Sequence, residues 1–323
     1  MHLNFKKMSS TYSYIKKNDY NLMDNFYLVL IKNTGEVIHN IFATSHKDLI
    51  AKYITPEDVR DRTYFKATFT PKEGCRLDDI DNYQLLFNEV YIPEWFSGEL
   101  EKDVKRLLRH IIGSMIIKNH RQLLLHEGGI LVGKGMVSEM KHSIIFAMYD
   151  ESVIDVLDNS SEVRYMTDDC FIVDMRDSTR VEEMLGFSKV KQMHNYSKII
   201  KMYGQAKVGE MFDNSRIAML KGDANILEMH DASQADRLKH LSCVSEMHGH
   251  SVIEEMWDWT LVEKMFDQSR INYMDEDSKV LEMHDESMIE MMAGNAIVEK
   301  LCENSLVRKL TNAAKILEQK LNN

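Results

Sequence analysis

The chain of 323 residues contains few cysteines, prolines and glycines, and it has no long apolar run. Its four scattered cysteines form neither a Cys-x-x-Cys motif nor a dense disulfide framework, which fits a reducing compartment. Three prolines and 14 glycines are too few for a linker-rich or collagen-like chain. No apolar stretch reaches the roughly 18 residues of a membrane span, and the N-terminus lacks the apolar segment of a signal peptide. We therefore expect a folded cytoplasmic protein that makes no membrane contact.

The net charge of −11 is unevenly distributed along the chain. Residues 1–142 carry a net +2, whereas residues 143–323 carry −13. An acidic surface argues against direct nucleic-acid binding. The change in composition predicts a domain boundary, and it coincides with the start of a repeat.

Residues 143–322 form twenty consecutive nine-residue units without an insertion or deletion. The first position of a unit is always small, the third is Val or Ile in nineteen units, and the sixth is Met or Leu in all but the last, which has Gln319. The eighth is Asp, Asn or Gly in sixteen of its nineteen interior occurrences, and these residues tolerate left-handed or tight-turn backbone. Each unit therefore carries its own turn.

A period of nine residues favours strands over helices. Nine residues advance an α-helix by about two and a half turns, so successive units would place their apolar columns on opposite sides. In a strand, positions one and three both point inward, and the flexible Met side chain enters the core after a bend. We therefore expect a mainly β fold with a parallel β-solenoid over residues 121–305, in which the Met column is core and not a metal ligand.

The seventh position indicates how many units make one rung of the solenoid. Rings occupy this position in alternate units, whereas the intervening units differ in character. A rung of two units, or 18 residues, would gather these rings on one edge and give about ten rungs; a triangular coil of another size would scatter them. The column contains His194, Phe212, His230, His248, Phe266 and His284.

The segments outside the repeat predict a small domain and two helical caps. Residues 1–22 are expected to be a flexible extension, and residues 23–96 a small α+β domain containing a hairpin around Gly35. Residues 97–120 have helical apolar spacing and are expected to cap the first rung. Leucines at similar spacing predict a second capping helix over residues 306–323. That helix, or the rod itself, offers a surface for a homodimer.

The layout resembles that of a group of uncharacterised repeat proteins encoded mostly by tailed phages. The resemblance covers roughly residues 85–310 and is carried by the Tyr91–Phe96 segment, the following helix, Gly128–Leu131 and the Ser-x-Val-x-x-Met units. It implies the architecture, a phage origin and hence the host-cell cytoplasm, but no activity. The Gly-Gly-x-Gly-x-Asp turns of calcium-binding toxin repeats are absent from this sequence.

Motifs for catalysis are scarce. The sequence contains no phosphate-binding loop, nucleophile elbow or paired-His zinc motif. His248 and His250, with His230 one rung away, come nearest to a metal site. We expect them to be surface residues and not metal ligands, because no carboxylate is placed to orient them. An acidic cluster in the N-terminal region is expected to be a solvated turn: Asp78, Asp79, Asp81 and Glu89. No loop interrupts the repeat to organise an active site, so we predict a protein without enzymatic activity, cofactor or metal.

These observations predict a binding scaffold that presents ladders of side chains to a macromolecular partner, most simply a protein. The expected contact surface is the ring column together with Trp257 and Trp259, because exposed aromatic rings anchor interfaces. One alternative is an acidic DNA mimic, although DNA carries one charge per roughly 1.7 Å, far denser than a net 13 over the repeat. Another alternative is a hexapeptide-type acyltransferase, which is indicated only by the small residue at position one and the aliphatic residue at position three.

Overall fold

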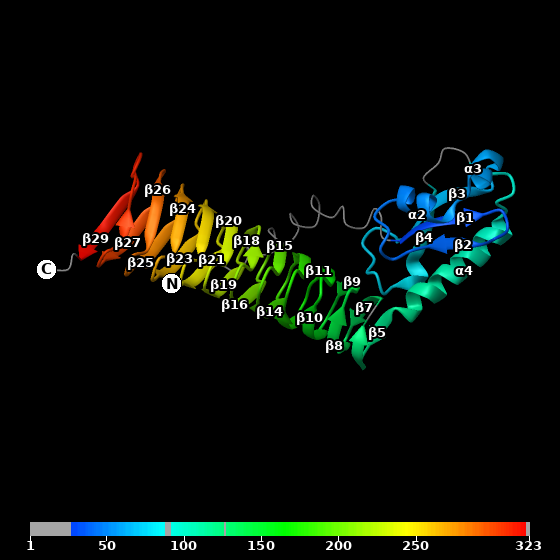
Figure 1. Ribbon diagram of the computed structural model, residues 1–323, viewed down its shortest axis with the longest axis horizontal. Helices are drawn as coiled ribbons and strands as arrows, with labels where there is room; N and C mark the ends of the chain where they lie inside the picture. Colours follow the sequence, from blue (N-terminus) through cyan, green and yellow to red (C-terminus); the bar gives the residue numbers. More distant parts are fainter. Residues whose placement is uncertain (1–26, 88–91, 126, 321–323) are drawn as a thin grey trace, which may run out of the picture. The chain divides into compact units, whose positions relative to one another are not determined.

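The computed structural model describes residues 27–87, 92–125 and 127–320, and it divides into two compact units, Met1–Met115 and Ile116–Asn323 (Figure 1). The extension expected over residues 1–22 lies outside the described residues. None of the described helices is long and apolar enough to cross a membrane.

The N-terminal unit is a small α+β domain, as expected. Its antiparallel sheet has the order β2-β1-β3-β4. The strands are β1 (Tyr27–Lys32), β2 (Val37–His39), β3 (Tyr64–Pro71) and β4 (Tyr83–Phe87), and the helices are α2 (His46–Tyr53), α3 (Pro56–Asp61), the short 3₁₀ helix η2 (Ile80–Asn82) and α4 (Gly98–Ser114). Gly35, with φ of 83°, makes the turn of the β1–β2 hairpin.

Helix α4 is shorter than the sequence predicts. The Ser97 hydroxyl caps it by accepting a hydrogen bond from the backbone N–H of Leu100, and Val104, Leu108 and Ile112 form its buried face. The prediction of a helix to residue 120 is wrong, because residues 116–118 are the first strand of the solenoid, β5, and pair with β7 (Gly128–Val132). The predicted capping role of this helix stays a prediction.

The second unit is a parallel β-solenoid built from two sheets (Figure 1). Paired residues such as Val163 and Val181, or Met166 and Met184, are 18 residues apart, which confirms the two-unit rung. Twelve strands form the sheet called sheet I here: β6 (Arg121–Leu125), β8 (Met136–Lys141), β10 (Val153–Asp158), β12 (Phe171–Met175), β14 (Lys189–Met193), β16 (Lys207–Met211), β19 (Asn225–Met229), β21 (Cys243–Met247), β23 (Leu261–Met265), β25 (Lys279–Met283), β27 (Ile297–Cys302) and β29 (Lys315–Lys320).

The facing sheet, sheet II, has thirteen strands. Besides β5 and β7 it contains β9 (Ile144–Met148), β11 (Glu162–Met166), β13 (Arg180–Met184), β15 (Lys198–Met202), β17 (Arg216–Ile217), β18 (Leu220–Gly222), β20 (Gln234–His240), β22 (Val252–Met256), β24 (Arg270–Met274), β26 (Met288–Met292) and β28 (Leu306–Val307).

The inward columns between the sheets are those that the repeat predicts. The small residue at position one, the aliphatic residue at position three and the Met or Leu at position six are buried from Val137 to Leu301 and form one continuous core. Flexible Met side chains fill this narrow space between the sheets. The Met column is therefore core.

The prediction of a C-terminal helix over residues 306–323 is wrong. Residues 306–307 and 315–320 are strands β28 and β29, which pair with β26 and β27 of the preceding rung. Of the leucines that suggest a helix, Leu310 also occupies position six of the nine-residue pattern. Hydrogen bonding to an existing sheet edge favours the strand. The solenoid thus spans residues 116–320 and not 121–305.

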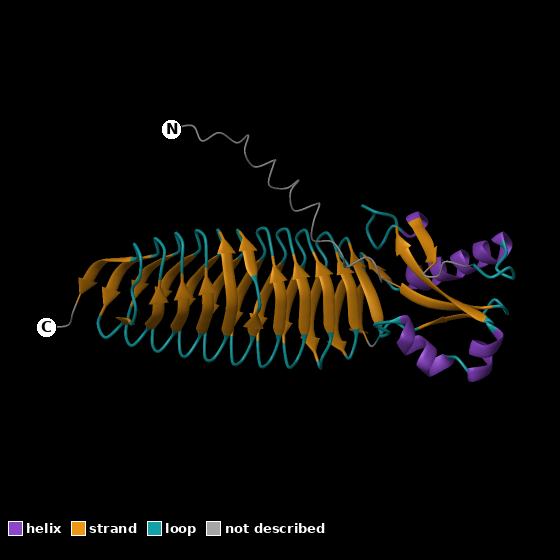
Figure 2. Cartoon of the chain, turned by 90° about the horizontal axis from the view of Figure 1, so that it is seen from above, coloured by secondary structure: helices purple, strands orange, loops and turns teal. Residues whose placement is uncertain are grey.

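The turns lie along two edges of the solenoid, between the sheets (Figure 2). All nineteen residues at position eight, from Asp150 to Asn312, have φ between 50° and 80°. Three of them, His240, Glu276 and Glu303, are neither Asp, Asn nor Gly. The left-handed turn is therefore kept even where the residue type does not favour it.

Candidate functional site

The residues expected to form one contact surface lie on two different edges. Edge A is the row of turns that follow strands of sheet I, from residues 158–160 to 302–304, and edge B is the row that follows strands of sheet II, from 149–151 to 311–313. The ring column lies on edge A. Trp257 and Trp259 follow β22 of sheet II and lie on edge B.

The six rings on edge A form one continuous stack, named the ring stack here. Neighbouring ring centroids are 4.9 to 5.1 Å apart, and the planes are within 15° of parallel. The histidine side chains are only 22 to 31% exposed. Because each interior ring covers the faces of its neighbours, the stack presents ring edges to solvent, and a partner cannot stack on those covered faces.

Glutamates hold three histidines of the ring stack, so the expectation that no carboxylate orients His230 and His248 is wrong. The Nε2 atoms of His230, His248 and His284 lie 3.0, 3.2 and 3.1 Å from the glutamate two residues earlier. The signal was present, since a Glu at that spacing precedes all three. Each ring is thereby oriented by its own strand.

Lysines of the next rung extend this network. Lys300 Nζ lies 3.2 Å from Glu282, whose other oxygen bonds His284. Hydrogen bonds from His284 and Lys300 hold the pKa of Glu282 below its usual value. Lys264 and Glu246 repeat the arrangement at 3.3 Å. The rung-to-rung pairs therefore tie the strands of sheet I together along edge A.

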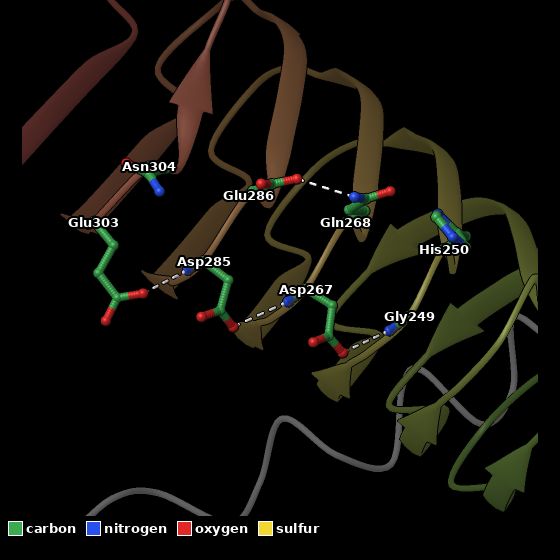
Figure 3. A pocket seen from close by; sticks show the side chains of 8 residues that line it. All are labelled: Gly249, His250, Asp267, Gln268, Asp285, Glu286, Glu303 and Asn304. Atoms are coloured by element: carbon green, nitrogen blue, oxygen red, sulfur yellow. Dashed lines mark hydrogen bonds between the residues drawn. The ribbon is translucent and has the colours of Figure 1, made fainter.

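A shallow depression of about 460 Å³ lies on edge A beside the end of the ring stack (Figure 3). It is lined by Gly249, His250, Asp267, Gln268, Asp285, Glu286, Glu303 and Asn304. Three of its four carboxylates each accept a hydrogen bond from the backbone N–H of the preceding turn. Across the described residues, no group of three or more His, Cys, Asp or Glu side chains is placed to hold a metal ion. His250 belongs to this depression, whereas His248 belongs to the ring stack.

The same hydrogen bond recurs on both edges. A carboxylate at position eight accepts from the backbone N–H one rung earlier, at 2.8 to 3.1 Å. The nine acceptors are Asp150, Asp168, Asp213, Asp231, Asp258, Asp267, Glu276, Asp285 and Glu303. Glu276 and Glu303 depart from the Asp, Asn or Gly pattern, but their carboxylates still accept this hydrogen bond. Many carboxylates of the turns therefore stabilise the stacking of one rung on the next.

Edge B carries Trp259, the most exposed of the aromatic side chains that the sequence analysis assigns to the contact surface. Trp259 is 63% exposed, and Leu241, at the same position one rung earlier, is 59% exposed. Trp257 is half-buried: Lys239 Nζ lies 6.0 Å from its ring centroid, the Tyr273 ring lies 5.3 Å away, and its N–H donates to Glu255 at 3.1 Å. Packing of Trp257 therefore holds the turn that projects Trp259.

The sequence pattern does not single out Leu241, because this residue occupies position nine, which the repeat leaves unspecified. That position follows the left-handed residue and points away from the core, so an apolar side chain there is exposed. Tyr196, 61% exposed, is the equivalent on edge A, and Phe187, 47% exposed, is another on edge B.

Comparison with protein-family models, with curated proteins and with solved structures finds no match to this chain.

Proposed function

We propose that the protein is a non-enzymatic scaffold whose solenoid holds exposed side chains in fixed positions for a macromolecular partner, a protein. The continuous core and the rung-to-rung hydrogen bonds support this, because they make the turns a rigid support. A rigid surface loses little conformational entropy when a partner binds. The phage origin and the host-cell cytoplasm that the repeat resemblance implies belong to the same proposal.

The observation that carries the proposal is the exposed pair Leu241 and Trp259 on neighbouring turns of edge B. Large apolar side chains on ordered turns are typical of interface anchors, and Trp is among the residues most enriched there. In the ring stack, most ring faces are covered by neighbouring rings, so a partner could contact only the ring edges. Leu241 and Trp259 are therefore better anchors than the ring stack.

The regularity of the array favours binding over catalysis. From residue 116 to 320 the described strands follow one another without a long inserted loop, the usual place for catalytic groups in such folds. The DNA-mimic alternative is less well supported, because the net charge of −13 over residues 143–323 is far less dense than that of DNA, which carries one negative charge per roughly 1.7 Å.

The test is capture of a partner from lysate of the cells that produce the protein. We expect the chain to retain a discrete partner that the double variant Leu241→Ser, Trp259→Ser fails to retain. Tyr196→Ser is the matched control, since Tyr196 is a similarly exposed aromatic at position nine of the other edge. Equal capture by all three chains would contradict the proposal for edge B.

A further inference from the structure

Three successive turns of edge B combine apolar and acidic side chains. Leu241 and Trp259 occupy position nine of the first two turns, and the third turn is Asp275-Glu276-Asp277. Neighbouring rungs are about 4.8 Å apart. An apolar patch of two rungs therefore borders directly on three consecutive carboxylates.

The turns on this patch are fixed by hydrogen bonds. Asp258 accepts from the backbone N–H of His240 at 2.9 Å, and Glu276 accepts from that of Asp258 at 2.8 Å. Asp277, which is exposed, accepts from the Asn295 side chain at 3.2 Å. The patch is therefore preorganised for binding.

The charge beside the apolar pair differs in sign between its two sides. On the side toward the N-terminus the turns contain Lys221 and Lys239, whose two positive charges outnumber that of Asp223, whereas the side toward the C-terminus has Asp275, Glu276 and Asp277 and no basic residue in its turn. A bound segment thus meets net negative charge only on the side toward the C-terminus.

We infer that this patch binds an extended segment of a partner protein in which apolar residues are followed or preceded, on one side only, by basic residues. Leu241 and Asp277 are two rungs apart, about 10 Å, which an extended chain covers in roughly three residues. The basic residues therefore lie about three positions from the first apolar residue. The inference rests on the proposed function and specifies the chemistry of its partner.

The probe is a synthetic peptide with two leucines followed by three lysines, compared with the same peptide carrying three glutamates. With the peptides immobilised and the full chain titrated, we expect the lysine peptide to bind at least tenfold more tightly, and salt to weaken this binding. Trp259→Ser is expected to lower the affinity at least tenfold, and Asp277→Asn several-fold.

The matched controls occupy position nine on edge A. Tyr196→Ser removes an equally exposed aromatic, and Glu286→Gln removes a carboxylate that, like Asp277, accepts from a neighbouring amide side chain. Both should leave the affinity within twofold.

Absence of binding, equal binding of the two peptides, or equal losses in the edge A and edge B variants would overturn the inference. If the lysine peptide fails while partner capture still depends on Trp259, this inference falls and the proposed function stands. If capture is also independent of Trp259, both fall.

Discussion

His230 and His248 lie face to face, with ring centroids 5.1 Å apart and planes 11° from parallel, although 18 residues separate them in the chain. Each ring is held by a glutamate two residues earlier, Glu228 or Glu246. The ring separation is close to the spacing of neighbouring strands, roughly 4.8 Å, so the backbone sets the distance at which the rings stack.

Removing a central ring should weaken the solenoid. Phe212 stacks on His194 and His230, each at 5.0 Å, and a stacked pair contributes about 0.5–1.5 kcal/mol beyond burial. We expect Phe212→Ala to lower the free energy of unfolding by about 2–3 kcal/mol, measured by urea denaturation. Phe187→Ala, on an exposed turn, should cost about 0.5 kcal/mol or less. Equal losses in the two variants would show that the stack contributes nothing.

The turns should depend on both backbone conformation and the carboxylate. Asp231 has φ of 53° and accepts from the Asp213 N–H at 3.1 Å. Asn keeps an acceptor and tolerates this φ, Gly keeps only the backbone freedom, and Ala keeps neither. Melting temperatures should therefore fall in the order Asp231→Asn, Asp231→Gly, Asp231→Ala. Asp231→Ala should lower the free energy of unfolding by about 2 kcal/mol. A Gly variant less stable than the Ala variant would contradict this account.

Gly209 should not tolerate a side chain. A Cβ there would lie 2.4 Å from the backbone carbonyl oxygen of Lys191 on the neighbouring strand, which is much closer than van der Waals contact allows. Gly209→Ala should lower the melting temperature markedly. Gly98→Ala, where a Cβ meets nothing within 4 Å at the start of α4, should be neutral or stabilising by up to about 1 kcal/mol. Similar melting temperatures for the two variants would refute the close approach.

Asp58 should titrate at unusually low pH. Hydrogen bonds from the Thr63 hydroxyl and from Thr55, together with the charge of Lys32, lower the pKa of Asp58 to about 2. Since this lies below the unfolded value of about 3.9, the contribution to stability is present above that pH and is lost as the pH falls through about 2. NMR titration should show the low pKa, and Thr63→Val should raise it more than Lys32→Met. No change in Thr63→Val would disprove this cause.

The nine-residue period predicted the inward columns and the alternation at position seven predicted the rung, because both follow from strand geometry alone. The C-terminal helix could not be decided in this way: Leu306 and Leu310 suit a helix and a strand equally, and only pairing with β26 selects the strand. The division of the contact residues was within reach, since Trp257 is nine residues from His248 and so belongs to the other edge. The exposure of Leu241 required the turn conformation.

The carboxylates at position eight reach back toward the rung that precedes them in the chain. Translation releases a chain from its N-terminus. A newly made rung therefore supplies the acceptor for a backbone N–H that is already in place, and each turn is completed by the segment synthesised after it. The solenoid is thus suited to fold rung by rung, from its N-terminal end, as the chain leaves the ribosome.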